Sequence, residues 1–192
     1  LRKLAVQENV AVLPQSLLET ATELCQTVPA SIGAILYAML PPEVRNGVQT
    51  YPSYTNPTSN EDSIPRGLTD TDDDRYIAYR SHIRQTFAHR GSVLFIVPSS
   101  ADVEYARARL EIGIENRVIT FANTHSTKQL HSAYKAFEDL RHAKLIITTA
   151  SYAFLDRHDL TTIIIEASGS PHYHLRNRPY FDLREVLKIY AK

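Results

Sequence analysis

Four short apolar runs, separated by amphipathic segments, constrain the fold more than any other feature of this sequence. The runs lie at 92–97, 117–121, 144–148 and 162–166. The first of them, SVLFIV, is apolar throughout, as expected of a strand that is buried on both faces of a sheet. Strands that alternate with helices are joined by right-handed crossovers, so we expect a parallel sheet sandwiched by helices, which is an α/β fold.

Apolar residues at helical spacing account for the intervals between these runs and for the end of the chain. The spacing predicts helices around 76–87, 103–110, 130–140 and 183–190. Ser99 or Ser100 is suited to capping the second of these helices.

The first 46 residues also have helical spacing, broken at Pro29 and at Pro41-Pro42. Two short helices bury little surface alone, so we expect them to pack on another part of the chain. Residues 47–75 lack an apolar period and are dense in turn formers, and residues 51–75 carry a net charge of −4. The sequence therefore predicts a helical segment at 1–46, an exposed acidic or polar linker at 47–75 and an α/β unit at 76–192.

Composition excludes several classes of protein. Apolar residues make up 43% and charged residues 22%, which excludes global disorder, and 21 Lys+Arg balance 21 Asp+Glu, which excludes a uniformly basic nucleic-acid coat. A single cysteine, Cys25, excludes an internal disulfide framework and indicates a reducing compartment. No apolar run approaches the roughly 18 residues that span a membrane, so we expect no membrane contact and a cytoplasmic location. Because the chain begins at Leu1, we expect a fragment of a longer protein.

Small and hydroxyl-bearing residues follow the predicted strands. They lie at 98–100, 122–125, 148–151 and 166–169. Ligands of parallel α/β sheets bind beyond the carboxyl ends of the strands, where such residues can donate hydrogen bonds to phosphates. Helix capping is the interpretation we favour, with phosphate binding as the alternative.

The order of the segments resembles the PriA family of bacterial primosomal replication-restart helicases, which belong to superfamily 2. The matching pieces are GSVLFIVP at 91–98, THS at 124–126, AKLIITTASYAF at 143–154, LTTIIIE at 160–166, PYFDLREV at 179–186 and, more weakly, LYAMLPP at 36–42. The resemblance covers most of 67–192 and, less closely, 11–46. It implies that the first segment is the end of a DNA-binding region and that 76–192 is a RecA-like first motor lobe. It also implies DNA and other primosome or replication proteins as partners, and ATP and Mg²⁺ as the family's cofactors.

The same resemblance predicts a degenerate nucleotide site. Where the family has the phosphate loop G-x-T-G-S-G-K-T, this chain has GLTDTDDD, which keeps Gly67 and Thr69 and places Asp73 and Asp74 at the Lys-Thr positions. A phosphate loop needs close backbone N–H groups and a neutralising lysine, and an acidic run supplies neither. We therefore expect no regular helix to begin within 51–75.

The family's D-E-x-H box is altered as well. Glu166 retains a carboxylate that can contact a metal, whereas Ala167 stands where the family has its catalytic glutamate. We therefore expect no catalytic residues and the loss of ATP and Mg²⁺ binding. The aspartate run and the pair His172 and His174 have the wrong spacing or too few ligands for a metal site, so none is expected.

Basic and aromatic residues after the third and fourth runs predict a DNA-facing surface. These residues are Arg157, Tyr173, Arg176, Arg178 and Tyr180. Cations contact phosphates and tyrosines stack on bases, although an ordinary solvated loop has the same composition. The sequence thus predicts a non-catalytic DNA-binding or scaffold lobe of a PriA-like primosomal protein. The alternatives are an active ATP-dependent helicase whose motor elements lie outside this chain, and a protein-interaction module.

Overall fold

A parallel four-stranded sheet forms the centre of the protein. The computed structural model describes residues 13–47, 49, 51, 66–175 and 177–191. The strands are β1 (Ser92–Val97), β2 (Val118–Phe121), β3 (Leu145–Thr149) and β4 (Leu160–Ile165), in the order β2-β3-β1-β4. The fold is α/β and of the RecA-like type, as expected, and the four predicted strands are confirmed to within two residues at each end.

The strands differ in how deeply they are buried. Val93 of β1 aligns with Leu145 of β3 on one side and with Thr162 of β4 on the other, and all three strand pairs are parallel. The central strands β1 and β3 are buried along their whole length, as their continuous apolar sequences predict. β4 is an edge strand of the described sheet and is only partly buried.

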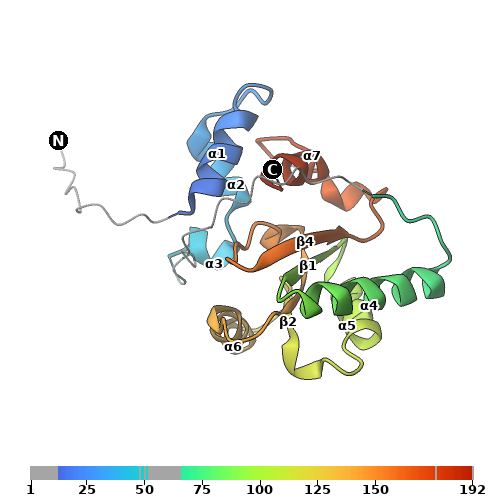
Figure 1. Ribbon diagram of the computed structural model, residues 1–192. Coiled ribbons are helices and arrows are strands. Elements are labelled where there is room, and N and C mark those ends of the chain that lie inside the picture. Colours follow the sequence, from blue (N-terminus) through green and yellow to red (C-terminus); the bar gives the residue numbers. More distant parts are fainter. Residues whose placement is uncertain (1–12, 48, 50, 52–65, 176, 192) are drawn as a thin grey trace, which may run out of the picture.

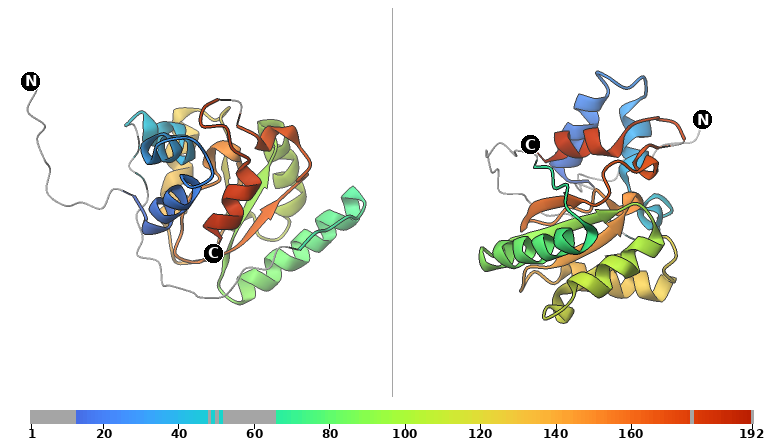
Figure 2. Two further views of the ribbon diagram at one scale, coloured as in Figure 1. Left: turned by 90° about the horizontal axis from the view of Figure 1, so that it is seen from above. Right: turned by 90° about the vertical axis from the view of Figure 1, so that its right-hand side faces the viewer.

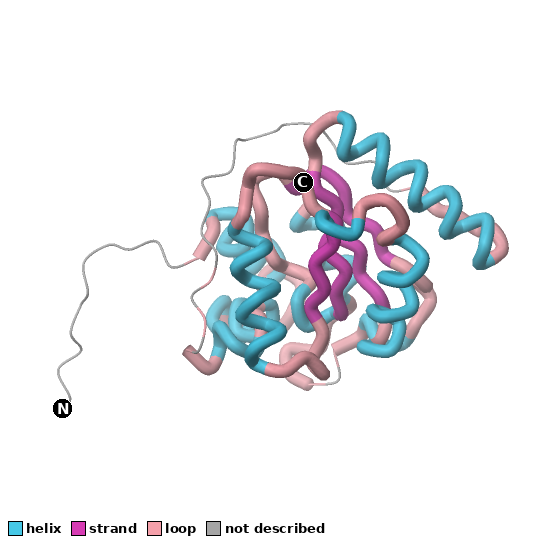
Figure 3. The backbone as a smooth tube through the Cα atoms, turned by 90° about the horizontal axis from the view of Figure 1, so that it is seen from below, coloured by secondary structure: helices cyan, strands magenta, loops and turns pink. Residues whose placement is uncertain are grey.

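Helices cover both faces of the sheet. The α-helices of the described residues are α1 (Gln15–Leu24), α2 (Ile32–Met39), α3 (Pro42–Arg45), α4 (Asp72–Ala88), α5 (Ser100–Leu110), α6 (Thr127–Glu138) and α7 (Leu183–Tyr190). In Figure 1, α1, α2 and α7 lie above the sheet, α4 and α5 lie below it, and α6 lies beside β2. Figure 2 shows the same layers from two other sides, and Figure 3 shows the strands side by side with helices around them.

Two apolar clusters form the core, one on each face of the sheet. Alternate residues of β1 contribute to each, with Leu94 in the first cluster and Phe95 in the second. Leu17 of α1 and Ile35 of α2 belong to the first cluster, together with residues of α6 and α7. The amino-terminal helices therefore pack on the α/β unit and share its core, which confirms the expectation that they pack on another part of the chain.

Tyr51 corrects the prediction that residues 47–75 are exposed. Its side chain is 2% exposed, its hydroxyl donates a hydrogen bond to the Phe154 carbonyl, and it accepts one from the Asp156 amide at 3.2 Å. This residue is therefore anchored in the core. Residues 52–65 of the predicted linker lie outside the described residues.

The expectation that no helix begins within 51–75 is wrong, because α4 begins at Asp72. Thr71 caps the helix and accepts a hydrogen bond from the Asp74 amide at 3.4 Å. Three aspartates then occupy the first turn, where the helix dipole favours negative charge. The acidic run is thus a helix-start signal, and the α/β unit begins four residues earlier than predicted.

Candidate functional site

Glu166, at the carboxyl end of β4, is held by two side chains of α4. Its side chain is largely buried, and Oε1 accepts hydrogen bonds from Arg75 Nη2 at 2.7 Å and Arg75 Nε at 3.2 Å. Oε2 accepts a hydrogen bond from the Tyr79 hydroxyl at 2.7 Å. Arg75 and Tyr79 are four residues apart on one face of the helix, so both reach the same carboxylate. Both oxygens of Glu166 are therefore engaged within the protein.

The protonation states of Arg75 and Tyr79 favour their hydrogen bonds to Glu166. The hydrogen bond to Glu166 raises the pKa of the Arg75 guanidinium, which is cationic at any physiological pH. Burial, followed by the hydrogen bond to Glu166, raises the pKa of Tyr79, so this phenol stays protonated as a donor. A guanidinium thus neutralises the carboxylate that the sequence offered as a metal contact.

The acidic start of α4 is bonded to α5. Asp72 accepts hydrogen bonds from Arg75 at 2.8 Å, from the Tyr105 hydroxyl at 2.6 Å and from Arg109 at 3.2 Å. Arg109 also forms an ion pair with Asp73. Asp72 and Asp73 are exposed, as predicted, but they belong to α4 and not to a linker, and they tie two helices together.

The residues predicted to form a degenerate phosphate loop do not form a cradle. Gly67 and Thr69 are exposed and lie outside any regular element. A Cβ added at Gly67 would meet no atom within 4 Å, so no close backbone approach requires glycine there. Asp74 accepts a hydrogen bond from the Thr71 hydroxyl at 2.6 Å, and Ala167 lies in the turn after β4 with a left-handed φ of 47°.

The site therefore does not fit ATP and Mg²⁺. Glu166 is paired with Arg75, residues 67–71 are exposed and outside any regular element, and three aspartates follow them. Within the described part of the chain, no group of three or more His, Cys, Asp or Glu side chains is placed to hold a metal ion. No nucleotide chemistry follows from this geometry.

Hydroxyls after β1 and β2 cap helices, as favoured from the sequence. The Ser99 hydroxyl accepts a hydrogen bond from the Asp102 amide and caps α5. In return, the Asp102 carboxylate accepts a hydrogen bond from the Ser99 amide at 3.0 Å. Ser126 and Gln129 form the same reciprocal box at the start of α6. These groups are therefore committed to local structure.

The prediction that Arg157 faces DNA is wrong. This residue is 1% exposed, and its guanidinium donates hydrogen bonds to the carbonyls of Phe137, Asp139 and His142. Its Nε also donates to Asp159 Oδ1 at 2.6 Å. Arg157 joins the end of α6 to the segment that enters β4, and its role is structural.

Tyr173 is buried as well, which corrects its assignment as a base-stacking residue. It has no exposed surface, and its hydroxyl lies 2.6 Å from the Glu166 carbonyl and 3.1 Å from the Ile96 carbonyl. Tyr180 is 63% exposed and Arg178 is exposed, whereas Arg176 lies outside the described residues. The predicted DNA surface is thus reduced to Arg178 and Tyr180.

The sequence motifs did not identify Arg75 and Tyr79, the two residues that bond the Glu166 carboxylate. The available signal was their spacing of four residues, which places them on one face of a helix that also carries Ile83.

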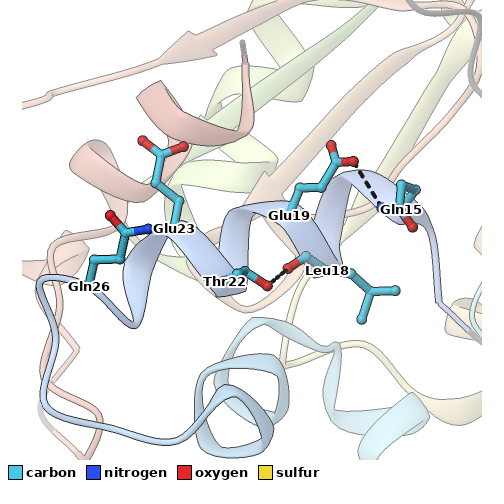
Figure 4. A pocket seen from close by; sticks show the side chains of 6 residues that line it. All are labelled: Gln15, Leu18, Glu19, Thr22, Glu23 and Gln26. Carbon is cyan, nitrogen blue, oxygen red and sulfur yellow. Dashed lines mark hydrogen bonds between the residues drawn. The ribbon is translucent and has the colours of Figure 1, made fainter.

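A surface hollow lies along α1 and offers no converging chemistry. Figure 4 shows its six lining side chains, all carried by α1 or the turn after it: Gln15, Leu18, Glu19, Thr22, Glu23 and Gln26. Gln15 donates to Glu19 at 2.9 Å, and Thr22 donates to the Leu18 carbonyl at 2.7 Å. Because one helix supplies all of the lining, the hollow is a helix surface and provides no enclosed site.

Neither a scan against protein-family models nor a search of curated proteins finds a match for this chain. Among the described residues, no helix combines the length and the apolar character required to cross a bilayer. The site is therefore interpreted from its own geometry.

Proposed function

We propose that this chain is a non-catalytic lobe of a PriA-like primosomal protein, which serves replication restart as a scaffold. The segments at 91–98, 143–154 and 179–186 carry the family part of the proposal. The ion pair between Arg75 and Glu166 is the single observation that carries the non-catalytic part.

Phosphoryl transfer requires a metal ion and fixed positive charges around the phosphates. A metal ion at Glu166 would compete with Arg75 and Tyr79, whose contacts lie between 2.7 and 3.2 Å. The guanidinium already supplies the positive charge that the carboxylate needs. The charge of Asp73 adds repulsion toward a triphosphate.

An apolar helix at the surface supports the scaffold role. The sequence of α2, IGAILYAM, carries no charge, and a helix that is apolar on all sides is normally buried. Here Ile32 is 44% exposed and Tyr37 is 58% exposed. Exposed large apolar side chains of this kind are suited to contact with another protein.

The test is an isothermal calorimetric titration of the full chain with Mg·ATP. We expect no heat of binding at submillimolar nucleotide, because the cationic loop residue is missing and the carboxylate is already paired. Micromolar affinity that is lost in a Glu166→Gln variant would overturn the proposal. A Lys188→Gln variant, which removes a surface charge on α7, serves as the control.

DNA binding is a second candidate, favoured by the exposed pair Arg178 and Tyr180. Fluorescence anisotropy of a labelled oligonucleotide across a salt series compares the parent with an Arg178→Ala, Tyr180→Ala variant. Loss of binding and a flatter salt dependence would support this candidate, since phosphate contacts give binding its salt dependence. Superimposed curves would exclude a DNA role for this pair of residues.

A further inference from the structure

A basic cleft lies at the amino-terminal ends of the strands, opposite the end at which ligands were expected. Its volume is about 570 Å³. The residues that line it, which we call the basic cleft, are Phe87, Arg90, Arg117, Leu140, Arg141, His142, Ala143, His158 and Asp159. Most of them come from the segments that enter the four strands. Because parallel strands begin at the same edge of a sheet, residues far apart in the sequence meet there.

Two arginines of the basic cleft have no counter-charge in the described structure. The side chains of Arg90 and Arg117 make no hydrogen bond or ion pair with any described residue, although Arg117 lies over the Phe87 ring at 5.6 Å. Arg141 differs from them, because Asp139 binds it at 2.8 Å.

The carboxylate in the lining is already neutralised. Asp159 accepts hydrogen bonds from the buried Arg157 at 2.6 Å and from the Ser92 hydroxyl at 2.9 Å. It therefore contributes little negative charge to the cleft, and the positive charges of Arg90 and Arg117 stay uncompensated.

Lys144 adds a third cation at the same edge of the sheet. It follows Ala143 of the lining and is 6% exposed, yet its side chain makes no hydrogen bond or ion pair with a described residue. Burial lowers the pKa of Lys144, and Arg157, Arg117 and Arg141 lower it further against the opposing effect of Asp139. A buried charge without a partner is unfavourable, and a bound anion would relieve it.

The backbone fixes where the Arg90 side chain leaves α4. α4 ends in a Schellman motif, in which the Gly91 amide donates to the Thr86 carbonyl and the Arg90 amide donates to the Phe87 carbonyl, each at 3.0 Å. Arg90 occupies the left-handed position of this motif with a φ of 62°. Glycine and asparagine adopt that conformation readily, whereas arginine does so under strain.

We propose that the basic cleft binds a phosphate group, with Arg90 and Arg117 of its lining as cationic ligands and Lys144, which adjoins the lining, as a third positive charge. The planar fork of a guanidinium matches two phosphate oxygens, and an ammonium adds a compact charge. The cleft volume lies within the range of roughly 300–1,000 Å³ that small-ligand pockets occupy. The phosphate belongs either to a small phosphate ester or to a DNA strand, and this site is independent of the proposed scaffold function.

The test titrates the full chain at low salt with inorganic phosphate, with AMP and with a fluorescent 5′-phosphorylated oligonucleotide. The cleft variant is Arg90→Asn, Arg117→Gln, which removes two side chains that form no hydrogen bond or ion pair with a described residue and keeps a residue suited to a left-handed φ at position 90. The matched control, Arg107→Gln, Lys128→Gln, removes the same charge at exposed positions elsewhere. We expect the cleft variant to bind phosphate at least about tenfold more weakly and the control to bind within about twofold of the parent.

Lys144→Met distinguishes a role of Lys144 in phosphate binding from a role in the stability of the fold. Methionine keeps the length of the stem and removes the buried charge, so we expect a higher thermal midpoint together with phosphate binding weakened at least about tenfold. A residue with a merely structural role would not change the two properties in opposite directions. If this variant does not fold, the arginine variant decides the question.

The proposal is overturned if the parent binds neither phosphate nor AMP with a Kd below about 10 mM, or if the cleft variant binds like the parent. If the cleft variant binds both the oligonucleotide and inorganic phosphate more weakly than the parent does, the phosphate is assigned to DNA. Oligonucleotide binding that is absent, or equal in parent and variant, assigns it to a small phosphate ester.

Discussion

Replacing Arg157 by methionine tests whether this arginine is a structural element of the core. The side chain has no exposed surface, and it supplies donors to three carbonyls and to Asp159, whose side chain is 13% exposed. Methionine fills the volume of the stem but leaves the carboxylate and the carbonyls without these donors.

The loss of stability follows from the pair and its burial. Breaking a buried ion pair by removing one partner costs about 3–5 kcal/mol, and the Ser92 hydroxyl that still donates to Asp159 favours the lower half of that range. For a chain of this length, about 3–4 kcal/mol corresponds to a decrease of roughly 6–16 °C in Tm.

Urea denaturation followed by circular dichroism measures the change as a lower midpoint at an unchanged slope. Arg178→Met is the control, because this exposed arginine should change stability by less than about 0.5 kcal/mol. Arg157→Met, Asp159→Asn should recover part of the loss, since it also removes the stranded charge. A loss below about 1 kcal/mol for Arg157→Met, or one equal to that of the control, would refute the structural role.

Two further perturbations test other parts of the structure. Tyr51→Phe removes the hydroxyl that joins the Phe154 carbonyl and the Asp156 amide, and it should cost about 1–2 kcal/mol in urea denaturation, whereas an exposed linker tyrosine would cost nothing measurable. The hydrogen bond from Arg184 lowers the pKa of Asp182, the residue that caps α7, below its ordinary value of 3.8. As the pH falls, Asp182 of the unfolded chain is protonated before Asp182 of the folded chain. The stability that the ionised Asp182 contributes is therefore complete above pH 3.8 and is lost as the pH falls through the lowered pKa. The Tm of the parent should therefore fall more steeply than that of Asp182→Asn below about pH 4, and parallel Tm profiles would contradict the assignment.

The central strands were predictable because their sequences carry the whole signal. β1 and β3 lie between two layers of helices, so every side chain is buried and the apolar run is continuous. The partly buried edge strand β4 has a weaker pattern, and its start was placed two residues late. The helix faces were equally readable, since Tyr76, Tyr79 and Ile83 are buried as their spacing indicates.

At the start of α4 the local sequence predicts a helix, but the resemblance to a phosphate loop led to a different expectation. Thr71 followed by three aspartates is a helix start, but alignment with a glycine-rich loop led to the expectation of irregular structure. Arg157 shows the limit of composition, because its acceptors come from the end of α6 and the residues beyond it, up to twenty residues away. The basic cleft could in principle have been found, because Arg90 precedes the first predicted parallel strand, and Arg117 and Lys144 begin the second and the third.

The release of phosphate from Mg·ATP by the full chain, measured with and without single-stranded DNA, tests the central claim most directly. Because Arg75 and Tyr79 bond both oxygens of Glu166 and three aspartates form the first turn of α4, the rate should equal that of buffer under both conditions. A rate of phosphate release above that of buffer, lost in a Glu166→Gln variant, would show that the Glu166 carboxylate leaves Arg75 and Tyr79 to take part in catalysis. That result would contradict the non-catalytic role.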